Sequence, residues 1–334
     1  MKAARATHER VSVHAPVFFP GGVADPAERV GYVGDSGEIV VVELAAGRPL
    51  WRTGVASRPL VVFGDRLAAA RLLPDDSNVL QIVVLDLTRR GESLLASDPV
   101  VFPEWVSVAN RASFGCAAHV EGGRLLLDWE ARARYGGGAA PPAQISRQST
   151  KSTAGTIAVD LQAGTVGSLP GAARRRPPLD PEDLTTPWPA GAKLARLVWE
   201  VDDGEQSLAL ETSDESTQEP ATVVELARGH GLVAQVTPDG RFLFVREAQA
   251  PPGDERWSVF SAETGRRVAT LSYERGAHSP AILGPTAYYM VEGTVGAGDV
   301  LQRTLAARAL DTDTLSWRLA LGERRVVEAP RLRQ

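Results

Sequence analysis

Cysteine and lysine are nearly absent from this chain of 334 residues. The one cysteine, Cys116, cannot form an intrachain disulfide and cannot build a thiolate metal cluster by itself. Its neighbours are small or apolar, so we expect it to be a buried core residue. The lysines are Lys2, Lys151 and Lys193. The chain therefore offers few side chains for Schiff-base chemistry.

Long apolar runs and an excess of positive charge are also missing. No apolar run reaches the roughly 18 residues that a membrane-spanning helix needs, and residues 1–10 contain no apolar core of a secretory signal. We therefore expect a cytoplasmic protein, or a periplasmic one if the true start lies upstream of Met1. The formal net charge of −5 argues against a nucleic-acid-binding surface. We expect a monomer without a transmembrane segment.

The sequence contains no HExxH, CxxC, GxSxG or phosphate-loop motif. The stretch Gly34-Asp35-Ser36-Gly37 is similar to the nucleophile motif of chymotrypsin-like proteases. It lies too near the start of the chain to follow the histidine and aspartate that such a serine requires. A hairpin turn explains the same residues, because Asp, Ser and Gly all favour turns.

Helical periodicity is absent as well, since no segment keeps an amphipathic pattern beyond a single turn. Short apolar runs alternate instead with turn residues, and hairpin signals occur at Asp35-Ser36-Gly37, Asp203-Gly204 and Pro238-Asp239-Gly240. Apolar residues make up 43% of the chain, which is enough for a substantial core. The sequence predicts an all-β protein.

The apolar runs recur in one pattern: a strand, an acidic or small polar residue, a turn and a second apolar pair. Its copies are anchored at Glu43, Asp86, Asp160, Glu211, Ala262 and Asp311. Most intervals are about 50 residues, which is typical of four-stranded propeller blades. We predict a single β-propeller domain, residues 1–334, with six blades, or seven if the stretch from Pro170 to Lys193 contains another. Insertions at residues 135–153 and 168–192 interrupt the pattern.

Three copies resemble a known repeat. Residues 32–51 contain a strand, a glycine turn and a terminal Trp51. Residues 309–317 repeat this pattern up to Trp317 but lack the glycine, and residues 260–265 keep its Thr-Gly turn but lack the aspartate. The pattern resembles the repeat of quinoprotein-type (PQQ-like) β-propellers, in which a Gly-containing turn, "ALD", "TG" and a terminal Trp recur. The resemblance implies a propeller, and we expect Trp51 and Trp317 to pack between adjacent blades.

The dehydrogenases of that family, as the resemblance implies, use a vicinal cysteine pair, a stacking tryptophan and a calcium site. This chain has only Cys116, so none of the family's catalytic residues is assigned to it. We expect no PQQ and no other cofactor. The family also includes envelope-assembly scaffolds, so the resemblance predicts the fold rather than the function.

Five residues are candidates for binding a ligand. His14, His230 and His278 lie in or beside the predicted first strand of a repeat, which lines the central channel of a propeller. Imidazoles at a channel mouth can bind a metal or an anion, although each could instead bond to a neighbouring blade. Arg175, within a run of three arginines, and Trp188 could grip a phosphate or carboxylate, unless their segment is a solvated linker.

The turns between the second and third strands of each blade share one face of a propeller with the links between blades. Both insertions belong to this face, and loops longer than about 12–15 residues are uncommon unless functional or disordered. The face gathers the acidic residues Asp35, Glu38, Asp75, Asp76, Asp202, Asp203, Glu205, Asp254, Glu255 and Asp299. Aspartate is a common turn residue, but together these acids predict a negative rim that favours cations or basic partners.

The function predicted from these features is non-catalytic: a scaffold that binds a protein segment or a small ligand on its loop-rich axial face. One alternative is a hydrolase or lyase with a histidine-lined site at the channel mouth, where His14, His230 or His278 acts as acid–base or metal ligand. The other is an exported envelope-assembly scaffold. No catalytic residue is assigned, and metal binding stays open.

Overall fold

The computed structural model describes residues 13–73, 77–109, 114–132, 152–169, 184–185, 187–214, 221–247, 255–272, 274–294 and 300–325. Every regular element within these ranges is a β-strand, and all strand pairs are antiparallel. The strands form six sheets, each built on four consecutive strands. This confirms the predicted all-β class of β-propeller type with six blades. The predicted insertion at 135–153 lies outside the described residues except for its end, which begins a strand.

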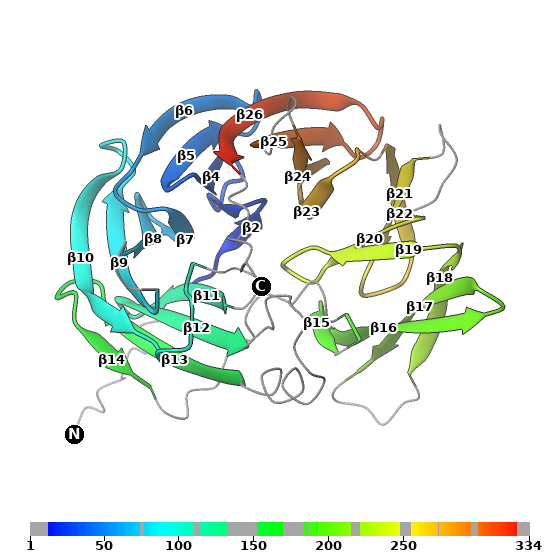
Figure 1. The fold of residues 1–334 in the computed structure, drawn as a ribbon, viewed down its shortest axis with the longest axis horizontal. Helices are drawn as coiled ribbons and strands as arrows, with labels where there is room; N and C mark the ends of the chain where they lie inside the picture. Colours follow the sequence, from blue (N-terminus) through cyan, green and yellow to red (C-terminus); the bar gives the residue numbers. More distant parts are fainter. Residues whose placement is uncertain are drawn as a thin grey trace, which may run out of the picture. The chain divides into compact units, whose positions relative to one another are not determined.

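The chain divides into two compact units, which are described separately. The first comprises Met1–Pro16 and Arg58–Pro177 and contains two sheets, drawn in cyan and green in Figure 1. One sheet consists of β7 (Arg58–Phe63), β8 (Arg66–Leu72), β9 (Val79–Asp86) and β10 (Glu92–Val101). The other consists of β11 (Phe114–Glu121), β12 (Arg124–Arg132), β13 (Ser152–Asp160) and β14 (Val166–Ser168), with β1 (Val13–His14) paired to β11.

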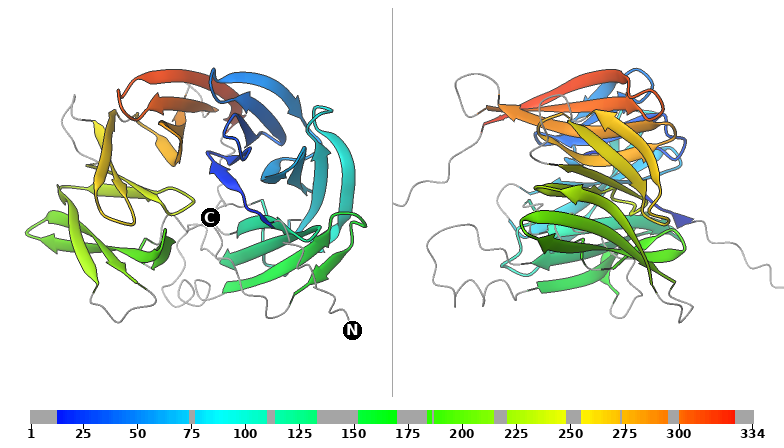
Figure 2. Two further views of the ribbon diagram at one scale, coloured as in Figure 1. Left: turned by 180° about the vertical axis from the view of Figure 1, so that it is seen from behind. Right: turned by 90° about the vertical axis from the view of Figure 1, so that its right-hand side faces the viewer.

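The second unit comprises Val17–Ser57 and Pro178–Gln334 and contains four sheets. The first consists of β2 (Val17–Phe19), β3 (Gly22–Ala24), β4 (Val30–Asp35), β5 (Glu38–Glu43) and β6 (Arg48–Thr53); the second of β15 (Trp188–Ala190), β16 (Lys193–Asp202), β17 (Glu205–Ser213) and β18 (Thr222–Gly229). The third consists of β19 (Leu232–Val236), β20 (Phe242–Glu247), β21 (Arg256–Ser261) and β22 (Arg267–Ser272); the fourth of β23 (Ala277–Leu283), β24 (Thr286–Thr294), β25 (Val300–Ala309) and β26 (Leu315–Arg325). Figure 2 shows these sheets from behind and from the side.

Two expectations about the repeats are corrected. The region 168–192 is not only an insertion, because it contains β15, the first strand of the β15–β18 sheet, and it adds no further sheet among the residues described. The anchor Glu211 lies inside β17 rather than at its end. His14 belongs to β1, which pairs with β11, the first strand of the β11–β14 sheet.

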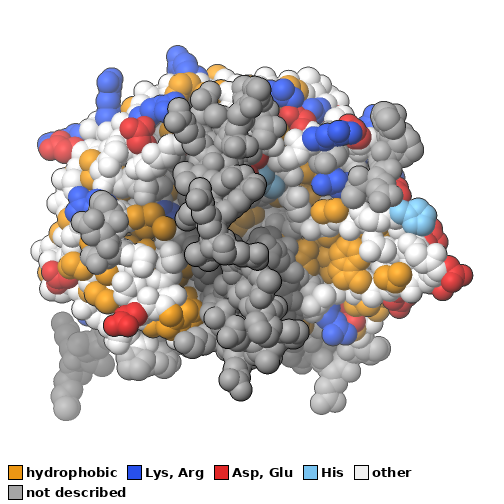
Figure 3. Space-filling view, viewed as in Figure 1, with side chains coloured by type: hydrophobic (Ala, Val, Ile, Leu, Met, Phe, Trp, Pro, Cys, Tyr) orange, Lys and Arg blue, Asp and Glu red, His pale blue; other side chains and the backbone are white. Residues whose placement is uncertain are grey.

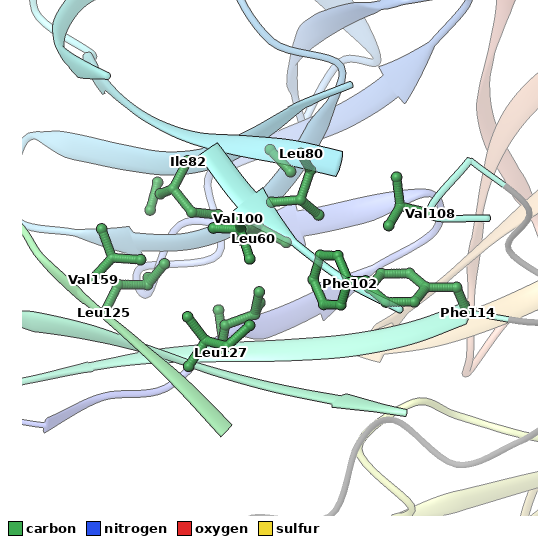
Figure 4. Packing of buried hydrophobic residues seen from close by; sticks show 14 of the residues in the cluster. Leu60, Leu80, Ile82, Val100, Phe102, Val108, Phe114, Leu125, Leu127 and Val159 are labelled. Atoms are coloured by element: carbon green, nitrogen blue, oxygen red, sulfur yellow. The ribbon is translucent and has the colours of Figure 1, made fainter. Parts of the chain in front are cut away.

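Apolar residues from facing sheets form the core of the first unit. In Figure 4, Leu60, Leu80, Ile82 and Val100 of the β7–β10 sheet lie opposite Leu125, Leu127 and Val159 of the β11–β14 sheet. Phe102 packs against Phe114 at a ring-centroid distance of 5.0 Å in an edge-to-face arrangement. Alternating side chains on one strand face two different neighbours, so a blade can bury both of its faces only by packing between two other blades.

The turn between the third and fourth strands is the structural element behind the sequence repeat. At Gly47, Gly91, Gly164 and Gly265 the glycine N–H donates to a carbonyl at the end of the third strand, and φ is positive. Asp313, with φ of 54°, takes the equivalent place in the β23–β26 sheet. The repeat therefore encodes a left-handed turn that reverses the chain within one blade.

The same turn brings neighbouring sheets together. A Cβ atom added to Gly47 would overlap the indole of Trp317, so no larger residue fits there without displacing that ring. The Trp317 Nε1–H donates to the Leu44 carbonyl over 2.8 Å. Trp317 thus packs between adjacent sheets, as predicted. Trp51 is half-buried in β6 opposite Val41, and its packing against another blade stays a prediction.

Candidate functional site

In the second unit, the turns between second and third strands meet the segments that link the sheets. His230 lies in the link between β18 and β19, and its Nδ1 is 3.2 Å from the carbonyl oxygen of Gly204 in the β16–β17 turn. Asp35, at the β4–β5 turn, accepts a hydrogen bond of 2.6 Å from the Gly322 N–H of β26. We call this end of the four sheets the turn end. It corresponds to the loop-rich face that the sequence predicts.

His278 belongs to a chain of polar side chains at the turn end. Its Nδ1 lies 2.9 Å from Ser279 Oγ, and its Nε2 lies 3.6 Å from Oε1 of Glu292 in β24. The same Glu292 oxygen is 3.4 Å from Nε of Arg303 in β25. Arg303 Nη1 in turn lies 3.3 Å from Asp35 Oδ1. The contacts run across three strands of one sheet and reach the next sheet at β4.

Two members of this chain are deeply buried. The side chain of Asp35 is 2% exposed and that of Arg303 is 5% exposed. Removing two charges from water is costly, so such a pair persists only where each charge has close partners. Asp35 therefore does not belong to the negative rim in which the sequence analysis placed it. It holds the β4–β5 turn against β25 and β26.

Ser279 has an unusual backbone conformation for a residue with a side chain. Its φ is 52°, and the pairing of β23 with β24 shifts register between His278 and Ala281. Residues other than glycine reach this left-handed region at some cost, and the cost is often met at functional sites. The bulge turns the exposed Ser279 towards the imidazole of His278.

The environment of His278 lowers its pKa. Burial lowers the pKa below the usual 6.5 because it disfavours the imidazolium form, and the positive charge of Arg303 adds to this effect, whereas Glu292 opposes it.

We expect this shift to make stability depend on pH. The unfolded chain takes up a proton on this histidine at a higher pH than the folded chain does. The free energy of unfolding should therefore fall as the pH decreases from about 7 to about 5.5, and His278→Gln should flatten that dependence. Urea unfolding of both proteins across this range measures the difference. Equal slopes in the two proteins would contradict the assignment.

His230 is exposed and has partners of its own. Its backbone N–H donates to Oε1 of Glu247 over 2.9 Å, and its ring contacts the Gly204 carbonyl. The backbone of His230 thus contacts a carboxylate of β20, whereas the ring of His278 lies beside a carboxylate of β24. His14, in the first unit, lies near Phe63 with a centroid distance of 6.4 Å.

The two remaining candidates for ligand binding are Arg175 and Trp188. Arg175 lies outside the described residues. Trp188 is 0% exposed, and its Nε1–H donates over 3.1 Å to the Gly240 carbonyl. The ring is enclosed by the core between the β15–β18 and β19–β22 sheets. In this structure Trp188 is a core residue with no surface to offer a ligand.

The sequence analysis missed the exposed apolar side chains of the β16–β17 hairpin. Trp199 is 36% exposed and Val201 is 68% exposed. Exposed acidic residues surround the turn that follows: Glu200, Asp202, Asp203 and Glu205. Figure 3 shows hydrophobic side chains with acidic ones beside them over the right-hand part of the view, where Figure 1 places β16–β18. The strand pattern alone predicts that these apolar residues are buried, so only their exposure reveals them.

Among the described residues, no group of three or more His, Cys, Asp or Glu side chains is arranged to hold a metal ion. The part of the chain that the structure describes also contains no helix long and apolar enough to cross a bilayer.

No protein-family model and no curated protein sequence matches the chain. Among solved structures, the dihydro-heme d1 dehydrogenase NirN in complex with DHE is similar at a TM-score of 0.42 and 12% identity, covering 94% of this chain and 80% of that one. Hsv2 from Kluyveromyces lactis is similar at a TM-score of 0.30 and 9% identity, covering 89% and 96%. Acylaminoacyl peptidase from Pyrococcus horikoshii has a TM-score of 0.33 and 12% identity, covering 95% and 52%.

These structures are all β-propeller proteins. They include enzymes as well as non-catalytic proteins, and none of the similarities carries an argument about the function of this chain.

Proposed function

We propose that this protein is a non-catalytic propeller that binds a segment of another protein at the turn end of its second unit. The observation that carries the proposal is the β16–β17 hairpin, where Trp199 and Val201 stay exposed beside an acidic turn. Tryptophan is strongly enriched among the residues that dominate protein interfaces. An exposed aromatic with a polar rim is the usual composition of such a surface.

The polar cluster around Asp35 supports a scaffold role. Asp35 forms an ion pair with Arg303 of β25 and accepts a hydrogen bond from Gly322 of β26, so the cluster connects two sheets. A rigid joint between two sheets keeps the turn end in one shape, which reduces the entropy lost on binding. We also propose that the repeats are of the PQQ-like type, which the packing of Trp317 on Gly47 supports.

Site-specific photo-crosslinking tests the binding proposal. A benzoylphenylalanine residue at Asp203, in the tip of the β16–β17 hairpin, should form a protein adduct in cells that express the full chain. The matched control is the same residue at Glu263, an exposed position in the β21–β22 turn at the opposite end of the unit. We expect an adduct at Asp203 that Trp199→Ala diminishes, and none at Glu263. Absence of an adduct at Asp203, or equal adducts at both positions, would contradict the proposal.

A second candidate function is hydrolysis, and the contact between Ser279 and His278 favours it. His278 Nδ1 is within hydrogen-bonding distance of Ser279 Oγ, so it can accept the hydroxyl proton as the oxygen attacks a carbonyl carbon. Glu292, on the other side of the ring, can stabilise the imidazolium that forms. Nucleophile, base and carboxylate thus follow one another in the order that serine hydrolases use, with 2.9 Å between the first two groups and 3.6 Å between the last two.

A fluorophosphonate probe distinguishes the two functions. If Ser279 is an activated nucleophile, the probe should label the folded protein, and both Ser279→Ala and His278→Gln should abolish labelling. Ser36→Ala is the control, because Ser36 is also exposed in a left-handed conformation, but its hydroxyl donates to the Asp35 carboxylate and not to a histidine. A protein that resists the probe, or one labelled equally after Ser279→Ala, rules out the hydrolase.

A further inference from the structure

Among the described residues, no strand pairs with the inner edge of the second half of β16. β15 pairs only with the beginning of β16, where Trp188 is opposite Ala195 and Ala190 is opposite Lys193. Figure 1 shows β16 continuing well past β15. Beyond that pairing, the described residues supply one further backbone partner on this side, the Leu184 carbonyl that accepts from the Leu197 N–H over 2.8 Å. From Trp199 onward, β17 is the one strand of the described part of the chain that pairs with β16.

The hairpin geometry determines which backbone groups face this edge. Asp203 and Gly204 have φ of 47° and 85°, which are the values of a two-residue turn that makes Asp202 and Glu205 a hydrogen-bonded pair. Alternate residues back along β16 then direct their N–H and C=O groups away from β17. The Leu197 N–H follows this alternation, because it bonds to Leu184. The N–H and C=O groups of Trp199 and Val201 therefore point towards the open edge.

The side chains at these positions are exposed as well. Residues two apart in a strand lie on the same face of the sheet. Trp199 and Val201 therefore share a face with the buried Ala195 and Leu197. An incoming strand would find unpaired backbone groups and apolar side chains in the same place. Exposed edges of this kind pair readily with other strands, and proteins usually block them.

The charge around the hairpin selects the occupant. Glu200, Asp202, Asp203 and Glu205 are all exposed, and the nearby Arg228 is bound to Glu225 over 3.0 Å. Two copies of this acidic hairpin would repel one another, which disfavours edge-to-edge pairing of β16 with itself. A segment that carries Lys or Arg would gain from the same charges.

We propose that the edge of β16 at Trp199–Asp202 takes an extended partner segment with alternating apolar and basic residues, which adds a strand to the sheet. This inference rests on the proposed binding function and specifies its mode. Backbone hydrogen bonds from Trp199 and Val201 give affinity, contact with their side chains selects the apolar positions, and the acidic turn selects the basic ones.

The experiment uses two proline variants of the full chain. Val201→Pro removes an N–H that faces the open edge and leaves the β16–β17 ladder intact. Val223→Pro is the matched control: Val223 is 60% exposed on β18, and its position between Thr222 and Val224 directs its N–H to the outer edge of the same sheet. Circular dichroism and melting temperature confirm that both variants are folded.

The probe is a displayed library of random linear peptides. We expect selection on the unaltered protein to enrich sequences that alternate Lys or Arg with apolar residues. A peptide so selected should bind Val201→Pro about tenfold or more weakly and Val223→Pro with unchanged affinity. N-methylation of alternate peptide amides should reduce binding by a similar factor without any change in the protein, and added salt should weaken it further.

Four results would overturn the inference. Two concern the selection: no enrichment, or enrichment of acidic sequences. The third is equal binding of the selected peptide by Val201→Pro and by the unaltered protein. The fourth is a dimer in sedimentation that Val201→Pro dissociates, because a second copy of the chain would then occupy the edge. If Val201→Pro binds normally while the photo-adduct at Asp203 persists, strand pairing is wrong and the binding function stands. Loss of the adduct in the unaltered protein would instead remove the binding function.

Discussion

Trp188→Ala should lower the free energy of unfolding by about 3–5 kcal/mol, the range for removing a large aromatic from a core. The indole is 0% exposed and lies among side chains of the β15–β18 and β19–β22 sheets. Alanine would leave a cavity there and would also remove the hydrogen bond to the Gly240 carbonyl. β15 is only three residues long, and Trp188 is the larger of its two buried side chains. Urea unfolding followed by circular dichroism measures the change.

Two further variants separate the contributions to this effect. Trp188→Phe keeps an aromatic ring but loses the indole N–H, so about 1–2 kcal/mol of destabilisation is expected. Trp199→Ala in the same sheet removes an indole that is 36% exposed and should cost less than about 1 kcal/mol. If Trp188→Ala cost no more stability than Trp199→Ala, the indole of Trp188 would not be packed in the core.

Asp35→Ala is the second change with a large expected effect, about 3–5 kcal/mol of destabilisation. It removes the carboxylate that faces Arg303 and that accepts the Gly322 N–H, and both partners lie in another sheet. A guanidinium that is only 5% exposed is then left with less compensation for its lost hydration. The shift in the urea midpoint at constant m-value gives the magnitude.

A double-mutant cycle identifies the cause. Arg303→Met removes the charge at the other end of the pair, so the double variant should be more stable than the sum of the single effects predicts. Ser36→Ala, beside Asp35 on an exposed turn, should change stability by less than about 0.5 kcal/mol. Strict additivity of Asp35→Ala and Arg303→Met would show that the two charges do not stabilise each other.

Most of the fold follows from local sequence. The turns at Asp35-Ser36-Gly37 and Asp203-Gly204 were predictable because the positive φ values that they need, 47° and 89° in one and 47° and 85° in the other, select Gly and small polar residues. The sequence repeat likewise predicts a turn at Gly47, and Trp317 packs against this turn. The boundaries of β15 were not predictable, because a strand as short as Trp188–Ala190 has no periodic pattern to recognise.

The candidate site depended on the tertiary structure far more than the fold did. The sequence pointed to His278 but gave no means of placing Glu292, Arg303 and Asp35 beside it, since those contacts cross strands and, at Asp35, sheets. It also grouped Asp35 with the surface acids and Trp188 with the ligand-binding residues, whereas both side chains are buried. Charge and aromatic character are visible in a sequence, but burial results from neighbours that are distant in the chain.

The sequence by itself determined the all-β class, the repeated four-stranded unit and the hairpin turns, because each depends on residues within a few positions of one another. Only the tertiary structure decided which strand edges are covered. The pattern of β16 is typical of a central strand. Among the described strands, however, none pairs with its inner edge at Trp199 and Val201, because β15 pairs with Lys193–Ala195 alone. Strand pairing is a contact between separate segments, so its extent is set by the length of the partner and not by the strand itself.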